Sequence, residues 1–334
     1  MQRTSRSHHR STPSGKAFAA FSSRYDGPMR LPLLLLLSAC TGTSPADTET
    51  EPEAAPIATY QFSFAVIADP HLSNSQDHVD RFADALDWID AESDARGIEV
   101  VLLAGDIAWG NGFPDAVRLL ADTVIPVAPM IGDNEIASGD EEVFHTSFTE
   151  HYVALESTLD GWRMAERPVH NPEHGVDSWL FNFAFEHRDV RFVGLDWSPR
   201  NETDRVLSEM GTLHNFEGGT LPFLVDELAS ATNALDSSVV MLTHQPMYLG
   251  PGGFFLDNWA TLTEAMLPYD NLLGINVAGH LHQDSEFHAY DTEVDLDVWI
   301  TDALWDDVVT VRIVDVWSDG QEVTYETVTE VVPH

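Results

Sequence analysis

Six short apolar runs of the chain end at an aspartate or a histidine, and both residue types can bind metal ions. The motifs at these ends are Asp69-Pro70-His71, Gly105-Asp106, Gly132-Asp133-Asn134-Glu135, Asp196, His244 and Gly279-His280-Leu281-His282. A single aspartate after a strand is usually a turn residue or a helix N-cap, but chance seldom repeats the pattern so often. Mixed carboxylate and imidazole ligands suit Zn, Mn or Fe better than Ca or Mg. Because the motifs hold more ligands than one ion needs, we expect two metal ions.

The segments between these runs have the residue spacing of amphipathic helices. For example, Val79, Phe82, Leu86 and Ile89 follow one another at intervals of three and four residues. Strands that alternate with helices favour an α/β fold. Ligands of such sheets bind beyond the carboxyl ends of the strands, so we expect the motifs to converge on one site.

This ordered set of motifs resembles the calcineurin-like metallophosphoesterases, and the resemblance covers most of the chain from Tyr60 to about Ile313. It implies an α/β fold of the metallophosphoesterase type, a four-layer α/β/β/α sandwich in which helices flank two packed sheets. The end of the chain agrees, because residues 308–316 and 322–331 alternate around Ser318-Asp319-Gly320 in the manner of a hairpin.

The resemblance also implies a set of metal ligands, carried over position by position. One ion would bind Asp69, His71 and His282, the other would bind His244, His280 and Asp133, and Asp106 would bridge them. The ions would be divalent or trivalent Fe, Mn or Zn. The implied reaction is hydrolysis of a phosphomonoester or phosphodiester by direct attack of a metal-bridging hydroxide, without a covalent intermediate.

The third motif departs from the family pattern, which is usually Gly-Asn-His followed by an acid. Asp133 can still bind metal, but its negative charge should make the ions weaker Lewis acids. Asn134 replaces a histidine thought to support the transition state or to protonate the leaving group, and an amide cannot deliver a proton at neutral pH. We therefore expect reduced activity and a preference for good leaving groups, unless a residue such as Glu135 takes over the proton transfer.

Other residues near the motifs have less specific patterns. Five histidines lie in segments that we expect to be loops and could reach the site to take over the proton transfer, although a surface position is their commoner role: His145, His151, His170, His174 and His214. Trp109 stands where similar purple acid phosphatases have a tyrosine ligand, so we expect no iron tyrosinate centre. We expect Asp196 to form a turn or a hydrogen bond rather than to bind metal. Aromatic residues of the intervening segments could stack on a substrate, but hydrophobic cover over the sheet is their commoner role: Trp162, Trp179, Trp197, Phe181, Phe183 and Phe185.

Two other functions fit the same motifs. One is a non-catalytic, metal-binding surface lipoprotein that keeps the fold but has lost turnover, which the presence of Asn134 suggests. The other is a cell-surface interaction protein whose acidic face binds Ca²⁺ or basic partners. All seven expected ligand positions still have metal-binding residue types, which favours the enzyme over a decayed site.

The charge of the chain excludes some partners. Of its 334 residues, 16 are Lys or Arg and 55 are Asp or Glu, so the net charge is −39, whereas nucleic acid binding needs a basic face. Apolar residues make up 43% of the chain, enough for a large core, which excludes a disordered acidic protein. The negative field of a chain with a net charge of −39 disfavours polyanionic substrates and favours small ones. It also indicates a salty or divalent-rich setting, because counter-ions relieve self-repulsion.

The amino-terminal part is typical of a bacterial lipoprotein. Met29-Arg30 precedes a leucine-rich run and Leu37-Ser38-Ala39-Cys40 resembles a lipobox, so we expect a leader at 1–39, with the signal peptide at 29–39 and an upstream extension at 1–28. Cleavage before Cys40 would leave 10 basic and 54 acidic residues and no lysine. We expect an acidic Thr/Pro/Glu-rich tether at 40–59 and a metallophosphoesterase domain at 60–334. The protein would be extracytoplasmic and anchored to a bacterial membrane through lipid on Cys40.

Overall fold

The computed structural model describes residues 57–200, 210–234, 238–289 and 294–333. The leader predicted at 1–39, the lipidation site at Cys40 and nearly all of the tether at 40–59 lie outside the described residues, so they stay predictions. Within the described part of the chain, no helix is both long and apolar enough to cross a bilayer.

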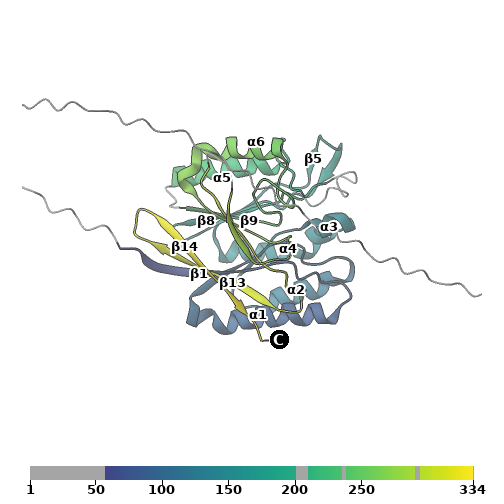
Figure 1. Cartoon of the computed structure of the whole chain (residues 1–334). Coiled ribbons are helices and arrows are strands. Elements are labelled where there is room, and N and C mark those ends of the chain that lie inside the picture. Colours follow the sequence, from purple (N-terminus) through teal and green to yellow (C-terminus); the bar gives the residue numbers. More distant parts are fainter. Residues whose placement is uncertain (1–56, 201–209, 235–237, 290–293, 334) are drawn as a thin grey trace, which may run out of the picture. The chain divides into compact units, whose positions relative to one another are not determined.

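The first sheet combines parallel strands with a terminal hairpin (Figure 1). Its strands, in spatial order, are β14 (Val323–Val331), β13 (Thr310–Ser318), β1 (Thr59–Ile67), β2 (Ile98–Leu103) and β3 (Val127–Pro129). Strands β1, β2 and β3 are parallel, whereas β13 is antiparallel to both β1 and β14. The β13–β14 pairing runs from Ser318 opposite Val323 to Thr310 opposite Val331, which confirms the predicted hairpin.

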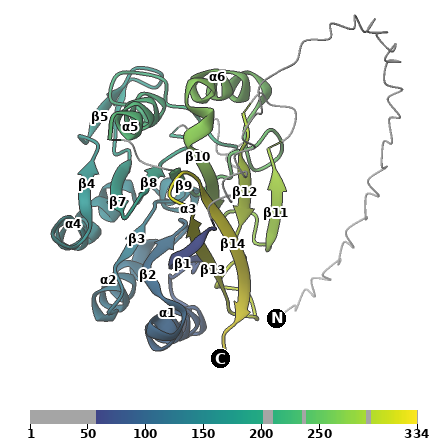
Figure 2. The same cartoon turned by 90° about the vertical axis from the view of Figure 1, so that its left-hand side faces the viewer.

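The second sheet lies against the first and is wider (Figure 2). Its strands, in spatial order, are β11 (Ser285–His288), β12 (Asp297–Ile300), β10 (Leu273–Ala278), β9 (Ser238–Thr243), β8 (Val190–Leu195), β7 (Phe183–His187) and β4 (Asp160–Met164). The four central strands β12, β10, β9 and β8 are parallel, and the outer ones are antiparallel to their neighbours. A separate ribbon pairs β5 (Val169–Asn171) with β6 (Val176–Ser178).

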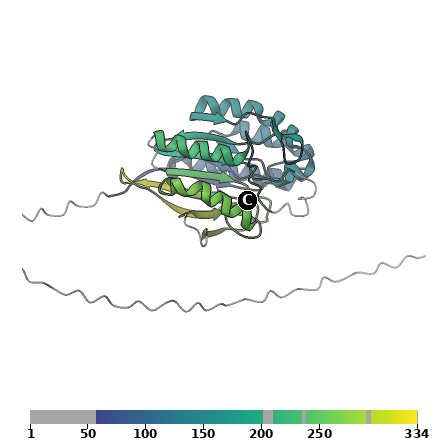
Figure 3. The same cartoon turned by 90° about the horizontal axis from the view of Figure 1, so that it is seen from above.

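Helices cover the outer face of each sheet, which gives the four α/β/β/α layers predicted from the resemblance (Figures 1 and 2). The helices are α1 (Gln76–Arg96), α2 (Phe113–Asp122), α3 (Asp133–Ser138), α4 (Glu141–Thr158), α5 (Thr220–Ala234) and α6 (Leu256–Met266), with short 3₁₀ turns at Gly110–Gly112 and Leu267–Leu272. Helices α1 and α2 cover the first sheet. Helices α5 and α6 lie side by side over the second (Figure 3), and α4 packs at the side against β3 and β4.

The helix α1 shows how the sequence pattern produces this arrangement. Its buried residues include Val79, Phe82, Leu86 and Ile89, the apolar stripe predicted from their spacing. The helix ends at Gly97, which adopts the left-handed conformation and donates its N–H to the carbonyl of Ser93.

Aromatic side chains fill the space between the sheets. Phe64 of β1 meets the ring of Phe192 of β8 edge to face at 5.3 Å, and Phe185 of β7 stacks on Phe192 at 4.8 Å. The predicted aromatic cover is confirmed, since Phe181, Phe183, Phe185 and Trp197 are fully buried and Trp162 and Trp179 pack against the core. This core fixes how the strand ends of the two sheets face each other.

Candidate metal centre

All seven residues predicted as metal ligands lie together at the carboxyl ends of β1, β2, β3, β9 and β10. Their ligand atoms form three overlapping groups, in each of which all atoms lie within 4.8 Å of one another: Asp69, His71 and His282; Asp133, His244 and His280; and Asp69, Asp106 and His244. We call the first of these the first ligand group and the second the second ligand group. Strands of both sheets contribute, so the site exists only in the folded domain.

Asp106 lies between the two ligand groups. Its Oδ2 is 3.3 Å from His71 Nε2 in the first group, and its Oδ1 is 3.3 Å from His244 Nε2 in the second. The carboxylate is buried, with 2% of its side chain exposed. One carboxylate that offers a separate oxygen to each group has the arrangement that a bridging ligand requires.

The backbone turns sharply at the ligands. Asp69, His71, Asp106, His280 and His282 all have positive φ angles between 48° and 70°. This left-handed region is uncommon for residues other than glycine and is found mostly where the surrounding structure enforces it. The strand ends therefore hold the ligand side chains in conformations that an unconstrained loop would seldom adopt.

Two glycines of the motifs leave room for the ligands. A Cβ atom on Gly132 would lie 2.1 Å from Asp106 Oδ1, and one on Gly279 would lie 2.5 Å from Asp69 Oδ2. Any larger residue would push these carboxylates out of the site. Steric exclusion, rather than chain flexibility, thus explains why these two positions are glycine.

The electrostatics of the site favour bound cations. Burial lowers the pKa of His71, but Asp106 and Asp69 raise it more, to about 9. Burial raises the pKa of Asp133, but His244 and His280 lower it well below its usual range. Although Asp69 Oδ1 and His71 Nε2 are buried, neither has a hydrogen-bond partner within the described part of the chain. A cluster of carboxylates that stabilises positive charge and leaves buried ligand atoms without hydrogen bonds fits metal ions.

His244 is oriented by the backbone. Its Nδ1 lies 2.9 Å from the carbonyl oxygen of Ala104, to which it can donate. That bond leaves Nε2 to face Asp133 Oδ1 at 2.8 Å and Asp106 Oδ1 at 3.3 Å. In metal-binding histidines, the N–H of the second ring nitrogen commonly donates a hydrogen bond to a carbonyl in this way.

Asn134 and Glu135 have different roles beside Asp106. The backbone N–H of Asn134 donates to Asp106 Oδ1 at 2.9 Å, and its side-chain amide donates to Asp106 Oδ2. Glu135 is fully buried, and its two oxygens accept the backbone N–H groups of Ala108 and Gly132 at 2.8 and 2.9 Å. Asn134 therefore faces the ligand cluster, whereas Glu135 ties together the loops that carry Asp106 and Asp133.

The five histidines considered as proton donors have other surroundings. The expectation that they all lie in loops is wrong for His145 and His151, which are on helix α4, and for His170, which is in a strand. His145 contacts Trp179 with tilted rings whose centroids are 4.2 Å apart, and His151 bonds to the carbonyl of Val127 at 2.7 Å. His170 is in strand β5, exposed and beside Asp177, and His174 is in the turn that follows. The expected surface position is wrong for His214, which is fully buried and bonds through Nε2 to the carbonyl of Ser198 at 2.9 Å.

Asp196 and Trp109 take structural positions beside the site. Asp196 accepts the backbone N–H of Phe181 at 3.0 Å and forms a buried ion pair with Arg200, which confirms the predicted hydrogen-bonding role. Trp109 contacts the ring of His71 edge to face at 5.2 Å.

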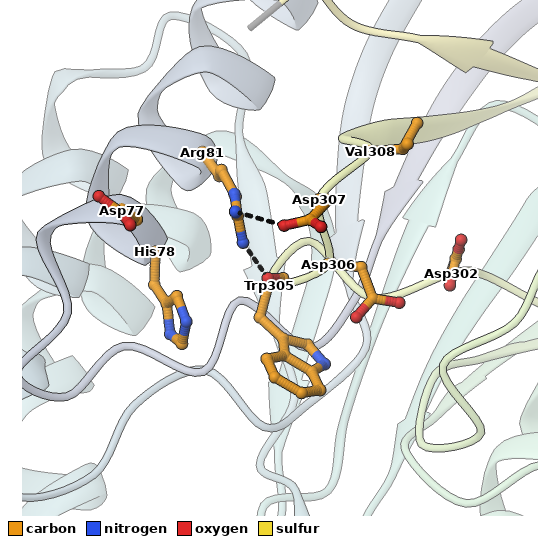
Figure 4. A pocket seen from close by; sticks show the side chains of 8 residues that line it. All are labelled: Asp77, His78, Arg81, Asp302, Trp305, Asp306, Asp307 and Val308. Carbon is orange, nitrogen blue, oxygen red and sulfur yellow. Dashed lines mark hydrogen bonds and ion pairs between the residues drawn. The ribbon is translucent and has the colours of Figure 1, made fainter.

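A cavity of about 560 Å³, whose lining residues are drawn in Figure 4, adjoins the first ligand group through Trp305. It is lined by Asp77, His78, Arg81, Asp302, Trp305, Asp306, Asp307 and Val308. Trp305 joins the cavity to the site, because its ring stacks on His71 at 5.4 Å and its indole N–H donates to His282 Nδ1 at 3.2 Å. Sequence reasoning missed Trp305, since no motif or spacing connects it to the histidines.

Comparison with known proteins identifies the class to which this fold and site belong. The family model described as calcineurin-like phosphoesterase matches residues 62–284, so the chain belongs to that family. This membership supports metal-dependent phosphoester hydrolysis as its general class of reaction.

One solved structure supports the fold at low sequence identity, and a second has a weaker similarity. A dimetal phosphatase from Danio rerio is similar with a TM-score of 0.53 and 15% identity, covering 82% of this chain and 100% of its own. A phosphopantetheinyl hydrolase from Mycobacterium tuberculosis is similar with a TM-score of 0.37 and 14% identity, covering 72% of this chain and 90% of its own. A search among curated protein sequences finds no match.

Proposed function

We propose that this protein is a dimetal phosphoester hydrolase that acts on a small substrate outside the cytoplasm. The observation that carries the proposal is the position of Asp106, whose two oxygens each face a histidine of a different ligand group at 3.3 Å. A site for a single ion would not need a buried carboxylate between two separate sets of ligands. Family membership gives the reaction class, and this geometry supports two ions.

Each ligand group supplies carboxylate oxygen and imidazole nitrogen, a donor set that suits Fe, Mn or Zn. Asp69, His71 and His282 would hold one ion, Asp133, His244 and His280 the other, and Asp106 both. When bound, the ions would lower the pKa of a water molecule and neutralise charge on the phosphate oxygens. The chain's own residues then have to place the substrate and to deal with the leaving group.

Protonation of the leaving group is the step for which the third motif supplies no proton donor. The amide of Asn134 is already engaged with Asp106 and has no proton to transfer at neutral pH. Glu135 is buried, and both of its oxygens accept backbone N–H groups, so it acts by holding the two loops in place. The enzyme should therefore prefer esters whose leaving groups depart without protonation, such as p-nitrophenyl esters.

Charge and the adjoining cavity support a small substrate, and the amino-terminal sequence supports a location outside the cytoplasm. A net charge of −39 opposes the approach of polyanions, while the ion-loaded centre attracts a single phosphate group. The cavity beside Trp305 has a volume within the range of small-molecule sites. The lipobox at Cys40 and the acidic tether support a membrane-anchored protein that meets its substrate outside the cytoplasm.

The test is turnover of p-nitrophenyl phosphate and bis-p-nitrophenyl phosphate with added Mn²⁺, Zn²⁺ or Fe²⁺. We expect hydrolysis that a chelator abolishes. The variant Asp106→Asn should lower turnover by more than about 100-fold and lose at least one ion, because it removes the charge of the bridging ligand. The exposed Asp160→Asn on β4 is the matched control and should behave as wild type. Full activity and full metal content in Asp106→Asn would overturn the site assignment.

A second candidate is a metal-binding surface lipoprotein without turnover, favoured by the single observation of Asn134 at the position of the family's histidine. It predicts bound metal and no hydrolysis of any ester. The substitution Asn134→His discriminates further. A large gain in rate on esters with poor leaving groups would support the missing proton donor, and an unchanged rate would refute it.

A further inference from the structure

We propose that Trp305 is a positioning residue of the first ligand group, and that its indole N–H must release His282 when that group binds a cation. The proposal rests on the proposed function, because it concerns the same metal centre. It adds a residue that lies beyond residues 62–284, the part of the chain that matches the family. It also adds a movement that the ligands alone do not require.

Trp305 contacts every member of the first ligand group. Its ring lies parallel to that of His71, with an interplanar angle of 6° and ring centroids 5.4 Å apart. Its backbone N–H donates to the carbonyl oxygen of Asp69 at 3.3 Å. Its indole N–H donates to His282 Nδ1 at 3.2 Å. One side chain and its backbone thus connect ligands that come from β1 and from β10.

The segment around Trp305 is held in place by hydrogen bonds that do not involve the ligand side chains. The N–H of Leu304 donates to the carbonyl of Ala68 at 2.9 Å, which attaches the segment to the end of β1. On the other side, the guanidinium of Arg81 donates to the carbonyl of Trp305 and to Asp307, as Figure 4 shows. The indole is therefore presented to the ligands from a fixed backbone.

Hydrophobic burial does not explain the position of this ring. Trp305 is 36% exposed and borders the cavity rather than the core. A tryptophan that served only as cover would pack against aliphatic side chains. The ring of Trp305 instead lies against three imidazoles, those of His71, His282 and His78.

The bond to His282 has a consequence for metal binding. A neutral imidazole has one N–H and one acceptor nitrogen, so if Nδ1 accepts the indole N–H, the proton is on Nε2. Nε2 is the nitrogen that faces Asp69, at 3.7 Å from Oδ1. Binding a cation there requires a free electron pair on Nε2 and therefore a proton on Nδ1. Two N–H groups cannot share that hydrogen bond, so the indole has to turn away.

These two roles have opposite consequences for two substitutions. Trp305→Phe keeps an aromatic ring against His71 and the backbone bond to Asp69, but removes the indole N–H that competes for His282. Trp305→Ala also removes the ring. Mutation of a residue that holds a metal ligand in place typically lowers metal affinity 10- to 100-fold. We therefore expect Trp305→Ala to weaken the first ion by about 10-fold or more, and Trp305→Phe to bind it at least as tightly as wild type.

The experiment is calorimetric titration of the full chain with Mn²⁺. It is repeated in a His280→Ala background, which removes a ligand of the second group and leaves the first ligand group intact. Trp88→Ala and Trp88→Phe, at a half-buried position on α1, are the matched controls. The expected result is a loss of affinity in Trp305→Ala that Trp305→Phe rescues, with both controls unchanged. Unchanged affinity in Trp305→Ala would overturn the positioning role. An equal loss in Trp305→Phe would overturn the release of the indole.

This readout separates the inference from the proposed function. If wild type binds Mn²⁺ but hydrolyses no ester, the proposed function fails, and the rank of the Trp305 variants still decides the inference. If wild type hydrolyses esters and Trp305→Ala binds both ions normally, the inference fails and the function stands.

Discussion

His214 provides a quantitative test of how the site-flanking loops are built. The side chain is fully buried, and burial together with the Arg200 guanidinium lowers its pKa from 6.5 to about 4. Because the unfolded chain takes up the proton in this range and the native protein does not, stability falls as the pH falls from about 6.5 to 4. The pKa difference gives a loss of about 2 kcal/mol between pH 7 and pH 5, and about 3 kcal/mol in total.

The assay is urea unfolding of wild type and His214→Gln at several pH values between 7 and 4.5, with chelator present so that metal binding does not contribute. Glutamine cannot titrate and can still donate toward the Ser198 carbonyl. The difference in unfolding free energy between the two proteins should shrink by about 2 kcal/mol from pH 7 to pH 5. The exposed His170→Gln is the matched surface comparison. A pH-independent difference for His214→Gln would refute the buried neutral histidine and return His214 to the candidates for proton transfer.

Three further predictions concern packing and charge. Arg200→Met should lower the unfolding free energy by about 3 to 5 kcal/mol in urea titrations, because it leaves the buried carboxylate of Asp196 without its cation; a loss under about 1 kcal/mol would contradict the importance of this pair. Gly279→Ala should weaken Mn²⁺ binding by about 10-fold or more, since its Cβ would lie 2.5 Å from Asp69 Oδ2, and wild-type affinity would show that the strand end can adjust. The melting temperature should rise with added salt, because counter-ions screen a net charge of −39, and a melting temperature that stays constant would contradict the expected saline setting.

The ligand cluster was predictable because its chemistry is local. Each ligand directly follows an apolar run, and the ends of parallel strands meet at one edge of a sheet, so the order of motifs was enough to bring Asp69, Asp106 and His244 together. Helix α4 was predictable too but was not predicted. Its buried residues Phe144, Phe148, Tyr152 and Leu155 have helical spacing, which would have placed His145 and His151 on a helix.

Contacts between distant segments were beyond sequence reasoning. The N–H groups that bind Glu135 come partly from Ala108, a residue of another loop, and only the folded backbone brings them together. The same holds for Trp305, which reaches His71 and His282 through the return of the chain after β12. Sequence patterns predict which residues end a strand, whereas the side chains that surround those residues depend on tertiary packing.

The metal content of protein purified without added metal tests the central claim most directly. Elemental analysis of the full chain should find two ions per chain, drawn from Fe, Mn and Zn, because Asp106 lies between two complete ligand groups and offers one oxygen to each. One ion or none per chain, or ions limited to Ca and Mg, would contradict the dimetal centre on which the proposed hydrolysis depends.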